Sequence, residues 1–91
     1  MSITLEAAAL NGAEVILSSD EMYRLGLSAS IGDQDDGLDL VVAHKWFNLA
    51  AMQGHVEARA YRKELALEMT QEEIAEAQRQ ARKYLSERRP S

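Results

Sequence analysis

The densest apolar pattern in the chain lies between Asp39 and Gly54, a segment that holds the only Trp and the only Phe. Its apolar positions recur at the spacing of a helix and cover more than half of the circumference: Val42, Ala43, Trp46, Phe47, Leu49, Ala50 and Ala51. A helix that is apolar on several sides must be covered by other elements. The pattern therefore predicts a stack of helices, with neighbours of this segment both before and after it in the chain.

The segment before the central helix also reads as a helix. Ser18 and Ser19 are suitable N-cap residues, Glu21 places a carboxylate in the first turn, and the apolar pattern runs to Ile31. Gly26 inside this helix costs about 1 kcal/mol relative to alanine. We expect it to allow a close approach between two helices.

Two further helices are predicted after Gly54, which is expected to end the central helix as a left-handed C-cap. Thr70 and Glu73 have the spacing of a capping box, which separates a helix over 55–69 from one over 71–87. The first of these has an apolar set of Val56, Ala58, Ala60, Tyr61, Leu65 and Leu67.

Residues 1–18 are harder to assign. Leu5 to Leu10 is rich in alanine and suits a short helix, while the apolar residues 15–17 suit a strand that has no partner in the sequence. We interpret residues 1–18 as an arm or short helix, partly disordered, and residues 19–91 as the helical domain.

A weak internal repeat is present, because Ala8-Ala-Leu-Asn-Gly12 echoes Ala50-Ala-Met-Gln-Gly54. The chain also resembles the Sel1-like repeat family, a relative of tetratricopeptide arrays. The residues that carry this resemblance are Leu25, Gly26, Gly32, Gly37, Asp39, Ala43, Trp46, Phe47, Ala50, Ala51 and Gly54. Ala29 departs from the pattern, since the family usually has tyrosine there.

The resemblance implies an all-α fold, a short α-solenoid of antiparallel helix pairs with about four helices. The repeat unit would span residues 20–54, a partial second unit residues 55–69, and a C-terminal capping helix residues 71–87. Members of this family typically act as adaptors that bind other proteins.

Charge and composition narrow the function further. The chain has 91 residues, no cysteine and a net charge of −5, with the acidic excess in residues 1–57 and a basic excess in residues 58–91. The overall charge disfavours general nucleic-acid binding. No segment is apolar enough to cross a membrane, and the N-terminus lacks the positive charge of a secretory signal, so a cytoplasmic protein is expected.

The most suggestive polar cluster is the acidic segment 33–39. An EF-hand loop that starts at Asp33 would need glycine at 38 and glutamate at 44, where the chain has Leu38 and His44. His44 and His55 lack the spacing by which one helix presents two metal ligands. We expect His44 to be a surface or partly exposed residue beside Trp46, and His55 to be a turn residue.

The sequence therefore predicts a non-catalytic protein–protein interaction module, without cofactor, whose partner is a protein. Self-association into a homo-oligomer is a further expectation, because so short an array has few internal interfaces. Two alternatives are a metal-responsive or catalytic module centred on residues 33–39 with His44, and nucleic-acid binding through the basic C-terminal helix. Candidate residues of the partner surface, on the concave face of the stack, are Tyr23, Leu27, Met52 and Arg59.

Overall fold

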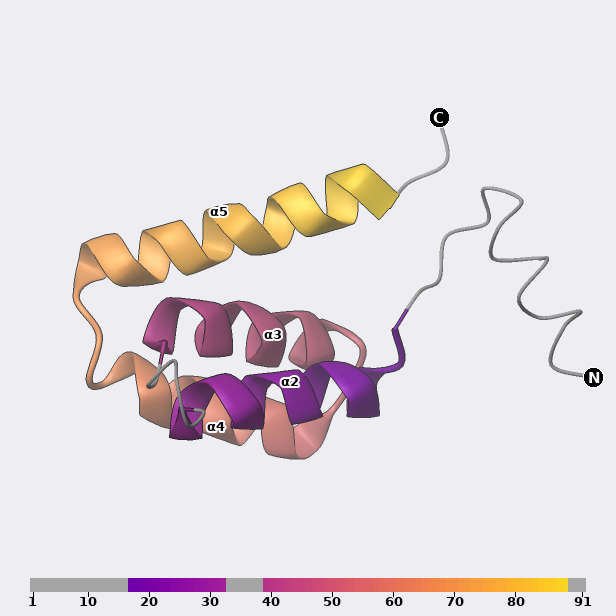
Figure 1. Cartoon of the computed structure of the whole chain (residues 1–91), viewed down its shortest axis with the longest axis horizontal. Coiled ribbons are helices and arrows are strands. Elements are labelled where there is room, and N and C mark those ends of the chain that lie inside the picture. The colour runs from indigo at the N-terminus through magenta and orange to yellow at the C-terminus, as the bar shows by residue number, and fades with distance from the viewer. Residues whose placement is uncertain (1–16, 33–38, 89–91) are drawn as a thin grey trace, which may run out of the picture.

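The computed structural model describes residues 17–32 and 39–88, and within these ranges the chain forms four α-helices and no strand (Figure 1). The helices are α2 (Ser19–Ile31), α3 (Leu40–Met52), α4 (Val56–Ala66) and α5 (Gln71–Arg88). The expected all-α class is thus confirmed for the described part of the chain. None of these helices is long and apolar enough to span a bilayer. The predicted arm lies almost entirely outside the described residues, as do Gly37 and most of the acidic segment.

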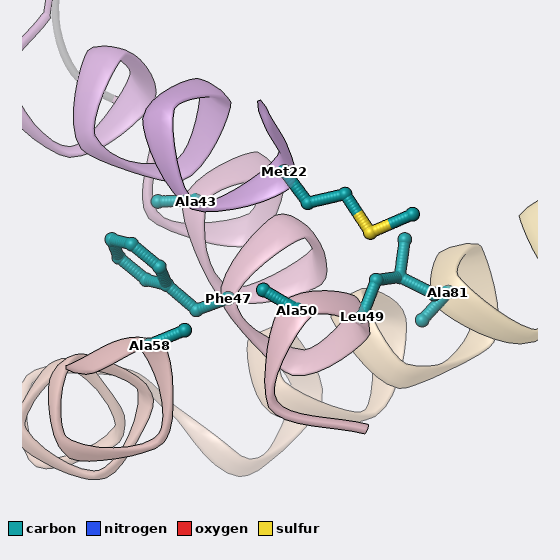
Figure 2. Packing of buried hydrophobic residues seen from close by; sticks show 7 residues of the cluster. All are labelled: Met22, Ala43, Phe47, Leu49, Ala50, Ala58 and Ala81. Carbon is teal, nitrogen blue, oxygen red and sulfur yellow. The ribbon is translucent and has the colours of Figure 1, made fainter. Parts of the chain in front are cut away.

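Helix α3 is the centre of the fold, since it packs against α2, α4 and α5 (Figure 1). Its own side chains form most of the core, and each of the other helices adds small or flexible residues to them (Figure 2). The cluster consists of Met22 from α2, Ala43, Phe47, Leu49 and Ala50 from α3, Ala58 from α4, and Ala81 from α5. The prediction that the segment with Trp46 and Phe47 is covered by neighbours on both sides in sequence is confirmed.

Side-chain caps define the helix starts. At α2, Ser18 and Glu21 form a capping box, with the Glu21 N–H donating to Ser18 Oγ at 3.1 Å and the Ser18 N–H donating to Glu21 Oε1 at 2.7 Å. Asp39 lies one position before α3 and accepts the Val42 N–H at 3.1 Å, so it is the N-cap itself. The predicted box at α5 is also confirmed, by reciprocal bonds of 2.8 and 3.1 Å between Thr70 and Glu73.

Helices α2 and α3 approach closely at Gly26. A β-carbon placed on this residue would lie 2.5 Å from Cε1 and 2.6 Å from Cδ1 of the Phe47 ring. The ring itself is fully buried and stacks on Tyr61 of α4 with 5.4 Å between centroids. The expectation that Gly26 permits close helix contact is confirmed, and Phe47 is the side chain that occupies the space.

The turn between α3 and α4 is short, and backbone hydrogen bonds fix its conformation. Gly54 has a φ of +90°, its N–H donates to the Ala51 carbonyl at 2.9 Å, and the His55 N–H donates to the Ala50 carbonyl at 3.1 Å. This pair of bonds is a Schellman motif, in which the left-handed residue favours glycine. The predicted C-cap at Gly54 is confirmed.

His55 follows at once as the N-cap of α4, and it also contacts α2. Its Nδ1 accepts the Ala58 N–H at 3.1 Å, which leaves the ring proton on Nε2 for a 2.9 Å hydrogen bond to Asp20. The ring stacks on Tyr23 with 4.4 Å between centroids. His55 is therefore a turn residue, as expected, and it joins three helices.

Helix α5 packs on α3 through small residues at one end and aromatic residues at the other. Ala77 and Ala81 are buried, and farther along the helix the Tyr84 ring meets the edge of Trp46 at 5.3 Å between centroids. Arg88 lies over the Tyr84 ring at 4.4 Å, a cation–π geometry. Although consecutive in sequence, α4 and α5 do not pack closely along their lengths.

The structure corrects two expectations about α4. The helix ends at Ala66, not at residue 69, and Met69 is buried in the connection to α5. Four of the six residues in the expected apolar set are exposed, including Val56 at 74% and Leu67 at 84%. The physical reason is that α4 is packed broadly on one side only, by α3.

Candidate functional site

A cleft of about 560 Å³ lies where α4 and α5 diverge over α3. Three helices contribute to its walls, and the set is dominated by basic and amide side chains. The lining consists of His44 and Asn48 from α3, Arg59, Arg62, Lys63 and Ala66 from α4, and Ile74 and Gln78 from α5. We refer to this set of residues as the basic cleft.

Three cations from two turns of α4 reach the basic cleft. Arg59, Arg62 and Lys63 are spaced i, i+3 and i+4, which places them on one side of the helix. None of the three forms an ion pair with any carboxylate in residues 17–32 and 39–88. An acidic protein thus has a local concentration of positive charge that its described residues do not neutralise.

One of these cations is held in place. Arg62 Nη1 donates a hydrogen bond of 2.7 Å to the side-chain oxygen of Asn48 on α3. Because a guanidinium has five donors in a planar fork, this single bond fixes its direction and leaves most donors available. Arg59 and Lys63 are exposed and border the opening.

His44 lines the cleft from α3 and is buried, with 3% of its surface exposed. This contradicts the expectation of a surface or partly exposed histidine, because the helices that cover α3 also cover this side chain. Its Nδ1 has no hydrogen-bond partner among the described residues. Burial lowers the pKa of His44 below 6.5, and the positive charge of Arg62 lowers it further, so the ring is neutral near pH 7.

The residues of the repeat resemblance serve mainly as scaffold. Ala43, Phe47 and Ala50 are buried, Trp46 packs on α5, and Gly54 forms the turn. The rest of the described set lies at the periphery of the core: Leu25 is 40% exposed, Ala51 is half-buried, Asp39 caps α3, and Gly32 ends α2 with a φ of +85°.

The residues of the predicted partner surface come from three helices, α2, α3 and α4. Tyr23 and Leu27 are half-buried against the core, and Met52 is 60% exposed at the end of α3. Only Arg59 belongs to the basic cleft. Sequence reasoning missed its companions Arg62 and Lys63, although their helical spacing was a readable signal.

The described residues offer few groups for the two alternative functions, a metal-responsive or catalytic module and nucleic-acid binding. No three His, Asp or Glu side chains gather as a metal site in the ranges described, and positions 33–38 lie outside them. On the basic C-terminal helix, Arg79 is paired with Glu76, whose pKa the pair and Gln80 lower to about 2. Arg88 is engaged with Tyr84, which leaves Arg82 and Lys83 as the exposed basic residues of described α5.

Comparison of this chain with protein-family models, with curated proteins and with solved structures finds no match.

Proposed function

We propose that this chain is a non-catalytic interaction module of the cytoplasm, built on a Sel1-like repeat and binding a protein partner. The packing of the repeat residues supports this. Gly26 lies against the Phe47 ring, and Gly54 turns the chain between α3 and α4. Close helix contact at a glycine and a turn at a glycine are what the resemblance implies for a helix-turn-helix unit.

The observation that carries the proposal is the outer face of α4. Val56, Ala60 and the C-cap residue Leu67 lie at helical spacing on the side turned away from α3, with Lys63 between Ala60 and Leu67, and all four are exposed. In a helical stack, such a face is covered by the next element. Here it is available to a partner, which would remove these exposed apolar side chains from water. A second copy of the chain would also cover it, which gives a homo-oligomer.

The polar groups that resemble catalytic pairs have structural tasks. His55 and Asp20 join α4 to α2, while Ser18 with Glu21 and Thr70 with Glu73 cap helices. This supports an interaction module over an enzyme, because a general base must be free to reach a substrate.

Site-specific photo-crosslinking in the native host tests the proposal. A photoreactive residue replaces Val56 or Leu67 on the outer face of α4, and Ser86, an exposed residue of α5, serves as the matched control. We expect positions 56 and 67 to crosslink to one and the same protein, and position 86 to give no such product. Equal labelling from all three positions would refute the proposed surface.

Sedimentation of the purified chain separates the two kinds of partner. A crosslinked product of twice the mass of the chain, together with concentration-dependent sedimentation, identifies a second copy. A stable monomer at all concentrations removes the homo-oligomer from the proposal.

A further inference from the structure

We propose that the basic cleft, which lies beside the outer face of α4, binds an acidic peptide segment of the protein partner. This inference rests on the proposed function, because it names the chemistry of the partner. It is carried by the arrangement of Arg59, Arg62 and Lys63 around a cleft that borders the buried His44.

The charge of the cleft is the first argument for an acidic peptide. The chain carries a net charge of −5, yet three adjacent cations of α4 have no carboxylate partner among the described residues. Elsewhere in the same structure Arg79 is paired with Glu76, and Lys45 and Arg88 lie over aromatic rings. Arg82 and Lys83 of α5 are also without an ion pair in the described residues, and the cleft differs from them in that three such cations line one cavity.

The geometry of Arg62 is the second argument. Its bond to Asn48 fixes the guanidinium across the α3–α4 interface before any ligand arrives. A planar guanidinium matches the two oxygens of a carboxylate, and a fixed one loses little freedom when it binds. Arg59 and Lys63 at the opening add attraction at longer range.

The remaining lining favours a peptide over a nucleic acid. Ala66 and Ile74 offer apolar contact for a side chain, and the amides of Asn48 and Gln78 suit a peptide backbone. Nucleic-acid sites need basic surface that follows several phosphates, together with aromatic side chains for unpaired bases. Among the described residues, no Phe, Tyr or Trp lines this cleft.

The test uses the full chain and a synthetic peptide in which Glu alternates with Leu, with a Gln–Leu peptide as the neutral probe and an oligothymidylate as the competing polyanion. Binding is followed by nuclear magnetic resonance. We expect the Glu peptide to shift the signals of His44, Asn48 and Arg62, and the other two probes to leave them unchanged.

Variants assign the site. The pair Arg59→Gln and Lys63→Gln removes two exposed cations of the cleft, and Arg82→Gln with Lys83→Gln removes two exposed cations of α5 as a matched control. The first pair should weaken peptide binding roughly tenfold, since each exposed ion pair contributes modestly, and the control pair should leave it unchanged.

Three outcomes overturn the inference: equal binding of the Gln–Leu peptide, equal weakening by the two variant pairs, or a stronger response to the oligothymidylate, which favours a nucleic acid. The crosslinks from positions 56 and 67 are measured in the chain with its cations intact, separately from the peptide titration. If they persist while the Glu peptide fails to bind, the inference fails and the proposed function stands. If the peptide binds and the crosslinks are absent, the proposed surface on α4 fails.

Discussion

Substitution of Gly26 by alanine sets two effects of opposite sign against each other. In a helix interior, alanine is more favourable than glycine by about 1 kcal/mol. The added β-carbon, however, would lie 2.5 Å from Phe47 Cε1, about 1 Å closer than ordinary carbon–carbon contact. The ring has little room to retreat, because it is fully buried and stacks on Tyr61.

The steric effect should dominate. Overpacking of a core costs about 1–3 kcal/mol and sometimes more, and a rigid ring places this site at the upper end. After subtraction of the helix propensity, we expect Gly26→Ala to lower the free energy of unfolding by about 2 kcal/mol. For a domain of this size, that is a large part of the total stability.

Urea denaturation followed by helical circular dichroism measures this change. Ser28→Ala, at an exposed position of the same helix, is the control and should alter the free energy of unfolding by less than about 0.5 kcal/mol. In a Phe47→Leu background the clash is absent, so Gly26→Ala should become neutral or stabilising, with a coupling energy of about 2 kcal/mol. A gain of about 1 kcal/mol from Gly26→Ala in the wild-type chain would show that helix propensity decides the site and refute the reasoning.

Three further predictions concern single residues. His55→Ala removes the N-cap of α4 and the bond to α2, and should lower the free energy of unfolding by about 1–2 kcal/mol in urea denaturation. His55→Asn should recover part of this loss, because asparagine can still cap the helix. Equal losses in both variants would contradict the capping role. Trp46→Ala should cost about 2 kcal/mol in the same assay, less than a fully buried indole, because Trp46 is half-buried against Tyr84; an unchanged stability would place the indole outside the packing. His44→Leu should raise the free energy of unfolding by about 1 kcal/mol at pH 7, since it removes a buried unpaired nitrogen. Because burial lowers the pKa of His44 in the folded chain, the unfolded state binds more protons at acidic pH. The free energy of unfolding of the wild-type chain should therefore fall as the pH drops below about 6.5, and His44→Leu should lack this part of the pH dependence. Identical pH profiles would rule out the buried neutral ring.

Most of the helix boundaries can be predicted from the sequence, because the residues that determine them lie close together in the chain. The capping box at Thr70 and Glu73 and the C-cap at Gly54 lie within a few residues of the groups that they satisfy, so spacing alone predicts them. Gly26 was also readable, since a glycine in an otherwise regular helix needs a reason. The identity of its partner, Phe47, required the three-dimensional structure.

The basic cleft was not predicted, because its position depends on contacts between distant segments. The spacing of Arg59, Arg62 and Lys63 shows that they share a side of α4, but it does not show which helix borders that side. The sequence does not predict the burial of His44 for the same reason, because that burial depends on how later helices cover α3. The outward position of Val56 likewise follows from the packing of α4 on one side only.

The turn at Gly54 and His55 has a consequence for how this chain tolerates changes of length. Each of its residues already caps the end of α3 or the start of α4. An inserted residue would therefore disturb one of these two caps. One more residue between Gly54 and His55 would separate the cap of α3 from the cap of α4. Either the bond from the His55 N–H to the Ala50 carbonyl or the bond from the His55 ring to Asp20 would then be lost. The length of this turn therefore couples the end of α3 to the contact between α4 and α2.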